Sequence, residues 1–208
     1  HPLVIESNVI YIHWVNSGML TINGINEIIR LNKPTILFTH DMWHFSAGCH
    51  QSYGGIDLKI GKEFFHIFGI ENTNKIIFNI GLKSFLKKNH INKKNENVHL
   101  VAPSVNFYNS IKKSNIINQS RVSVISNALD TDFFKPKTYI KKDSKIKILY
   151  GAMGFNNNKF KGWNDFLFFS KKIKKIFSEK VEIYVFGYDF NESEMKEHDF
   201  ISKSFGRI

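Results

Sequence analysis

The segment that decides the expected fold is Pro34-Thr35-Ile36-Leu37-Phe38-Thr39-His40-Asp41-Met42-Trp43. Its first half is a short, mostly apolar run rich in β-branched and aromatic residues, which is typical of a strand buried in a parallel sheet. Polar residues follow abruptly at His40 and Asp41. Ligands of open α/β sheets bind beyond the carboxyl ends of the strands, so an imidazole and a carboxylate placed there are candidates for chemistry. The alternative is that Asp41 caps a short helix and His40 is a satisfied interior histidine.

The segments around this strand predict an alternation of strands and helices. Val9–Val15 is expected to form the first strand, and apolar residues at helical spacing between Ile22 and Leu31 predict an amphipathic helix that completes a β-α-β unit. Ser104 has no base beside it in the sequence, so we expect it to cap a helix rather than to act as a nucleophile. The remaining elements expected in this part of the chain are strands at Val98–Ser104 and Arg121–Ser126 and helices at Leu58–Phe68, at Lys75–Asn89 and through Ile111.

A junction near Pro136 divides the chain into two expected domains, residues 1–136 and 137–208. The segment Lys137–Lys145 is charged and poor in apolar residues, which is typical of a domain boundary. A second α/β unit is expected to follow it, with strands at Ile146–Tyr150 and Val181–Gly187 around a loop from Gly151 to Asn158 and a helix from Trp163.

Composition restricts the class of protein. The 208 residues are 42% hydrophobic, which is enough for packed cores. A net charge of +11 favours anionic partners, and the run Lys171–Lys175 predicts either a solvated helix face or a patch facing an anionic membrane. Cys49 is the only cysteine in the sequence, which rules out an internal disulfide and suggests a reducing compartment. No apolar run reaches the length of a transmembrane helix, and no signal peptide is visible.

The irregular segment from Met42 to Gly55 is expected to be a loop at the active site. His44, Cys49 and His50 lie in it, but structural zinc sites use four ligands at tighter, recurring spacings. The sequence also lacks an acidic cluster such as Asp-x-Asp that would hold a divalent ion. We therefore expect no metal site.

Six short motifs, in this order, resemble the bacterial family 4 glycosyltransferases, most closely the branch that serves exopolysaccharide and O-antigen synthesis. Each falls at a predicted strand end or loop, and together they cover nearly the whole chain. They are Ile12-His13-Trp14-Val15-Asn16-Ser17-Gly18; His40-Asp41-Met42-Trp43 with Gly48-Cys49-His50; Ala102-Pro103-Ser104; Asn127-Ala128-Leu129-Asp130 with Phe134-Lys135-Pro136; Lys161-Gly162; and Val185-Phe186-Gly187.

The resemblance implies a GT-B architecture, in which two Rossmann-like domains with parallel sheets face each other across a cleft. Residues 1–136 would form the acceptor-side domain and residues 137–208 the beginning of the nucleotide-sugar domain. Both would be incomplete, because the family's first strand would lie before His1 and its acidic Glu-x7-Glu region beyond Ile208. The implied reaction transfers a sugar, with retention, from a nucleotide-diphosphate-sugar donor to a saccharide or lipid-linked acceptor. It needs no metal or cofactor and would occur in the cytoplasm, peripherally on the inner membrane.

The resemblance also assigns roles to particular residues. His40 would lie near the donor sugar and diphosphate, and Asp41 would hold this histidine or the start of the loop. Cationic groups and free N–H groups at a helix start stabilise a leaving diphosphate, and Lys161-Gly162 would supply both. The implied set is His40 and Asp41 for catalysis; Lys161, Gly162, Lys159 and Asn127 for the donor; and Asn16, Gly18, Trp43 and His50 in the acceptor-side loop.

Two other functions compete with sugar transfer. A GT-B epimerase or phosphorylase would keep the fold and change the chemistry. A basic nucleic-acid binder would interleave exposed aromatics with its charges, whereas the aromatics here fall at core-like helical and strand positions. We therefore expect no nucleic-acid partner.

Overall fold

The computed structural model describes residues 1–15, 18–52, 54–136, 145–154 and 159–207. The chain divides into two compact units, His1–Phe134 and Lys135–Ile208. The boundary expected after residue 136 lies close to this division. Both units contain parallel sheets with helices, so the chain has the expected α/β fold.

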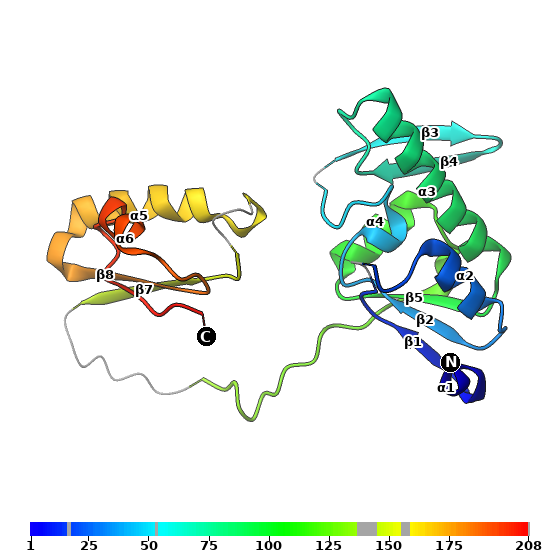
Figure 1. Ribbon diagram of the computed structural model, residues 1–208, viewed down its shortest axis with the longest axis horizontal. Helices are drawn as coiled ribbons and strands as arrows, with labels where there is room; N and C mark the ends of the chain where they lie inside the picture. Colours follow the sequence, from blue (N-terminus) through cyan, green and yellow to red (C-terminus); the bar gives the residue numbers. More distant parts are fainter. Residues whose placement is uncertain (16–17, 53, 137–144, 155–158, 208) are drawn as a thin grey trace. The chain divides into compact units, whose positions relative to one another are not determined.

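The first unit is built on a parallel sheet of four strands in the order β1-β2-β5-β6 (Figure 1). Leu37 of β2 pairs with Leu100 of β5, and both side chains are buried in the core. The strand predicted from the deciding segment is confirmed, whereas the first strand is shorter than expected. The bounds are β1 (Ile10–Ile12), β2 (Thr35–Phe38), β5 (Val98–Ala102) and β6 (Val122–Val124).

Helices connect these strands, and polar side chains mark where the helices begin. Thr21, Asn74 and Ser104 each accept a hydrogen bond from a backbone N–H in the first turn of the helix that follows. The expectation that Ser104 caps a helix is therefore confirmed. The helices of the first unit are α1 (Pro2–Glu6), α2 (Ile22–Ile29), α3 (Lys75–Lys94) and α4 (Val105–Ser114), with 3-10 turns η1 (Trp43–Phe45) and η2 (Gln119–Arg121).

The helix expected at Leu58–Phe68 is wrong, because the segment forms part of an antiparallel hairpin. Strand β3 (Gly55–Ile60) pairs with β4 (Glu63–Phe68), and Gly61 turns the chain between them at φ +63°. In β3 the exposed residues Asp57 and Lys59 alternate with apolar ones that pack against the core, which is the two-residue period of a strand. This alternation and the glycine turn, rather than helical spacing, determine the local structure.

The second unit has a parallel sheet in the order β7-β8-β9, and Figure 1 shows α5 and α6 on the same side of β7 and β8. The buried residues Val181, Ile183 and Val185 of β8 pack in one core with Trp163 of α5. The predicted strands and helix of this unit are confirmed. The bounds are β7 (Ile146–Gly151), η4 (Lys159–Lys161), α5 (Trp163–Phe177), η5 (Ser178–Lys180), β8 (Val181–Phe186), α6 (Glu192–Glu197) and β9 (Lys203–Ser204).

Candidate functional site

The parallel order of the first sheet places His13 and His40 at the same carboxyl edge, directly beyond β1 and β2. His13 Nδ1 lies 2.8 Å from His40 Nε2, and the His13 ring stacks on Phe38 with centroids 4.5 Å apart. One nitrogen of such a pair must donate and the other accept, so the two rings share one proton. His40 is exposed, which excludes the alternative of an interior histidine.

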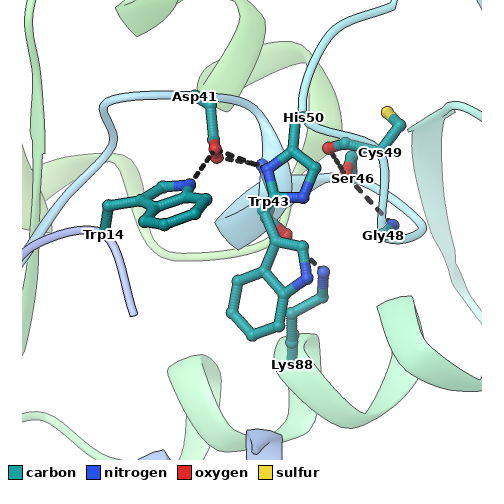
Figure 2. Close-up of polar contacts among 8 residues, drawn as sticks. All are labelled: Trp14, Asp41, Trp43, Ser46, Gly48, Cys49, His50 and Lys88. Atoms are coloured by element: carbon teal, nitrogen blue, oxygen red, sulfur yellow. Dashed lines mark hydrogen bonds and ion pairs between the residues drawn. The ribbon is translucent and has the colours of Figure 1, made fainter. Parts of the chain in front are cut away.

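Asp41 lies beside this pair and accepts three hydrogen bonds (Figure 2). Its Oδ2 atom lies 2.8 Å from Trp14 Nε1 and 2.6 Å from His50 Nδ1. Its Oδ1 atom accepts a hydrogen bond of 2.9 Å from the backbone N–H of Trp43, where the turn η1 begins. The expected structural role is therefore seen at the loop start, but the histidine that Asp41 holds is His50 rather than His40.

The loop that follows is anchored at several points along its length. The backbone N–H of Met42 donates to the carbonyl of His50, and that of Ala47 donates to the carbonyl of Phe68 in β4, both at 2.9 Å. Within the loop, Ser46 Oγ donates to the Cys49 carbonyl at 2.8 Å (Figure 2). The irregular segment is thus held in a defined shape that presents His50 next to Asp41.

Lys88 of α3 supports this loop from below, and the motifs did not predict it. Its ammonium group donates to the Trp43 carbonyl and lies 4.6 Å from the centroid of the Trp43 ring (Figure 2). The side chain is buried, and burial lowers the pKa of Lys88 to about 7, although Cys49 and Asp41 act in the opposite direction. The sequence signal was present, because Lys88 falls on the same helical stripe as the buried residues Phe85 and Ile91.

His44 is buried in the loop, and Cys49 is half-buried beside the core. Burial lowers the pKa of His44 to about 4, with a further contribution from the charge of Lys88, so this imidazole is neutral near pH 7. Burial raises the pKa of the Cys49 thiol, which favours its protonated form. Within the described part of the chain, no three His, Cys, Asp or Glu side chains come together as a metal site would require.

The first unit contains three further residues predicted for the acceptor side and one predicted for the donor, and the structure describes all of them except Asn16. Gly18 is exposed at φ +87°, a conformation that glycine adopts readily, whereas Asn16 lies outside the described residues. Trp43 is half-buried in η1 above Lys88. Asn127 is exposed beyond β6, at the same edge of the sheet as His40.

The remaining predicted donor residues belong to the second unit. Lys161 is exposed in η4, and its carbonyl accepts a hydrogen bond of 2.7 Å from the Tyr150 hydroxyl. Gly162 is the N-cap of α5 at φ +69°, and a glycine offers no side chain to cap the backbone N–H groups of the first turn. Asp165 in that turn places negative charge near them, which opposes the binding of an anion. Lys159 begins η4, and its side chain lies outside the described part.

A hollow of about 730 Å³ lies at the opposite, amino-terminal edge of the first sheet. It is bordered by Glu96 before β5 and by Arg121 before β6. Arg121 donates to two backbone carbonyls, and Lys93 on its wall forms an ion pair with Glu63. Arg121, Lys93 and Glu63 thus already have partners within the fold, so the carboxyl edge remains the stronger candidate site.

Comparisons of the chain with models of known protein families and with curated proteins find no match. Among the described residues, no helix has both the length and the apolar character needed to cross a membrane.

Proposed function

We propose that the chain belongs to a retaining, metal-independent glycosyltransferase of the GT-B type, with two Rossmann-like domains. The enzyme would transfer a sugar from a nucleotide-diphosphate-sugar to a growing surface polysaccharide or a lipid-linked acceptor. The observation that supports this most is the convergence of His13, Trp14, His40, Asp41 and His50 at the carboxyl edge of a parallel sheet. This edge is where open α/β sheets bind their ligands.

The imidazole pair suits the donor side of the reaction. When His13 Nδ1 carries the shared proton, it donates to His40 Nε2, and a neutral His40 then carries its own proton on Nδ1. In this tautomer the Nδ1–H group of His40 can donate to an oxygen of the donor. Negative charge develops on the diphosphate as the glycosidic bond breaks, and a fixed donor aimed at it lowers the barrier. His13 thereby sets the tautomer of His40 that the reaction needs.

Binding of nucleotide-sugars gives a first test of this function. A ligand that binds only the native state raises its unfolding temperature, so the full-length protein should be melted with UDP-, GDP- and dTDP-sugars at millimolar concentration. At least one donor is expected to raise the melting temperature, and the corresponding nucleoside monophosphate should do so less. A melting temperature that no nucleotide-sugar changes would contradict the proposal.

In the second unit, Lys161 is assigned to the diphosphate of the donor. A charge-assisted hydrogen bond is typically worth about 1.5–3 kcal/mol, so Lys161→Ala in the full-length protein should raise the dissociation constant for the nucleoside diphosphate roughly tenfold or more. Asp165→Asn should have the opposite effect, because it removes negative charge from the first turn of α5. Lys175→Ala, at an exposed lysine in the last turn of α5, is the control. Calorimetry that finds equal affinity in all four proteins would make Lys161 a surface lysine.

The enzyme would act at the cytoplasmic face of the inner membrane, bound peripherally to anionic lipid. Support comes from α3, where Ile76, Ile80, Lys83 and Lys87 are all exposed and fall on one helical stripe. Exposed apolar residues joined by lysines on one helix face are typical of helices that lie in a membrane interface. Ile77 lies beside this stripe and is also exposed.

Vesicle binding tests the membrane assignment. Co-sedimentation of the protein with phosphatidylglycerol vesicles is expected at low salt and should be lost at high salt, since salt screens exposed charges. The double substitution of Ile76 and Ile80 by Asp should reduce binding strongly, whereas Leu129→Asp, at an exposed leucine outside α3, should not. Equal binding to neutral phosphatidylcholine vesicles would count against an electrostatic attachment.

A further inference from the structure

His50 is held in one orientation by the carboxylate of Asp41. The Nδ1 atom of His50 lies 2.6 Å from Asp41 Oδ2, and a carboxylate can only accept a hydrogen bond, so Nδ1 carries the proton. In the neutral ring the lone pair is then on Nε2, on the side facing away from Asp41. The His50 side chain is 49% exposed and that of Asp41 only 16%, so the carboxylate is sheltered while the imidazole faces solvent.

Asp41 is itself fixed by its other partners. The indole N–H of Trp14 and the backbone N–H of Trp43 both donate to it, at 2.8 and 2.9 Å. The carbonyl of His50 accepts the backbone N–H of Met42, which ties the backbone of the histidine to the residue after Asp41. His50 is therefore held at both its backbone and its ring. This is the arrangement in which an aspartate orients a histidine and stabilises its positive charge after it takes up a proton.

An aromatic side chain lies beside the His50 ring, on the side of Asp41 (Figure 2). The ring of Trp14 lies 6.1 Å from that of His50 at 48°, and Trp14 is half-exposed (Figure 2). An exposed indole beside a polar group suits a sugar ring, which has an apolar face and a rim of hydroxyl groups. A saccharide that packs on Trp14 would therefore lie beside the His50 ring, within the part of the surface that Asp41 orders.

We propose that His50 is the general base that takes the proton from the attacking hydroxyl of the acceptor. The inference rests on the proposed function. In the step, the acceptor oxygen forms a bond to the anomeric carbon of the donor while its proton passes to His50 Nε2. The bond from the anomeric carbon to the diphosphate oxygen breaks, and its electron pair leaves with the diphosphate. The resulting imidazolium is stabilised by Asp41, and the retention proposed above requires the acceptor oxygen to attack on the face of the sugar from which the diphosphate leaves.

The competing role is structural, in which the hydrogen bond between Asp41 and His50 only fixes the conformation of the loop. A general base contributes about 10²–10⁴-fold to a rate, so His50→Gln in the full-length protein should lower kcat by at least about 100-fold. A pinning residue would be replaced well by glutamine, whose amide can still donate to Asp41. His90→Ala, at an exposed histidine on α3, is the matched control and should leave the rate unchanged.

Two measurements distinguish a general-base role of His50 from a purely structural one. A general base acts only in its unprotonated form, so the rate of transfer by the wild-type protein should show an acid limb that His50→Gln lacks. The pair of His13 and His40 is present in both proteins, so the difference isolates His50. Added imidazole should restore part of the rate to His50→Ala, because the site is open to solvent.

The outcomes also separate this inference from the proposed function. The test uses UDP-glucose and GDP-mannose as donors and octyl glycosides as acceptors. If the wild-type protein neither transfers nor hydrolyses any nucleotide-sugar, the proposed function fails. If the wild-type protein transfers sugar and His50→Gln keeps both its rate and its acid limb, only the assignment of His50 is overturned. Loss of transfer without rescue by imidazole, in a folded His50→Ala protein, would also contradict a proton-transfer role.

Discussion

Lys88→Met is expected to stabilise the protein below about pH 7 and to remove part of the pH dependence of its unfolding. Burial lowers the pKa of Lys88 in the folded protein from 10.5 to about 7. Below pH 7 both the folded and the unfolded chain hold this proton, and the folded state then bears the full penalty of a buried charge. Between about pH 7 and 10.5 the unfolded chain binds more protons, so the contribution of Lys88 to the free energy of unfolding increases with pH.

The size of the stabilisation expected for Lys88→Met follows from the lowered pKa of Lys88. One pKa unit corresponds to about 1.4 kcal/mol, so the penalty amounts to several kcal/mol. Methionine loses the hydrogen bond to the Trp43 carbonyl, which offsets part of the gain. Replacement of a buried charge by an apolar group of similar volume typically stabilises by about 1–4 kcal/mol, and we expect a value in this range at pH 6. Above pH 10.5 the neutral lysine keeps its hydrogen bond, so the advantage of methionine should disappear.

Urea unfolding at pH 6 and at pH 9.5 measures the effect. The difference in unfolding free energy between Lys88→Met and the wild-type protein should be clearly larger at pH 6. Lys87→Met is the control, because Lys87 is the exposed neighbour on the same helix and its removal should change little at either pH. A difference for Lys88→Met that is the same at both pH values would show that Lys88 is not a buried cation in the folded protein.

His40→Ala is expected to lower the rate of sugar transfer by about 100-fold or more while the protein stays folded. Removal of one preorganised donor from a site of developing charge typically costs about 10²–10³ in kcat. Stability should hardly change, since His40 is exposed and its side-chain hydrogen bond is to His13. His13→Ala should cause a smaller loss, because it leaves the His40 ring in place and removes only the partner that sets its tautomer.

The comparison that checks this assignment is His40→Ala against His90→Ala in the same transfer assay, with circular dichroism to show that both proteins are folded. Near-normal turnover by His40→Ala would remove His40 from the reaction. A loss of transfer that is matched by His90→Ala would point to a general effect on the fold instead.

Much of the fold could be predicted because it depends on local periodicity. The apolar run before His40 predicts β2, and a serine before a helical pattern predicts the cap at Ser104. The extent of β1 was not predictable in this way, because it depends on the pairing with β2, whose last pair is Ile12 with Leu37. The hairpin at β3 and β4 was missed because its short apolar stretches are ambiguous between helix and strand without the turn at Gly61.

The site was predictable only as far as strand ends determine it. Parallel strands place His13 and His40 at one edge whatever the loops do. The partnership of Asp41 with His50 depends on the path of an irregular loop, which spacing alone does not determine. Lys88 lies far along the chain on α3, and its role became visible only when the loop was placed above it.

The most direct test of sugar transfer at this edge is the fate of a labelled sugar. Full-length wild-type protein and His40→Ala would be incubated with nucleotide-sugars that carry ¹⁴C in the sugar, together with a polyprenyl-diphosphate-linked saccharide acceptor. The wild-type protein is expected to release nucleoside diphosphate and to move label into the acceptor with retained anomeric configuration, while His40→Ala does so at about one hundredth of the rate or less. A glycosyltransferase site at His40 would be contradicted if the labelled sugar stayed on the nucleotide, whether unchanged or isomerised. It would also be contradicted if His40→Ala transferred the labelled sugar as fast as the wild-type protein.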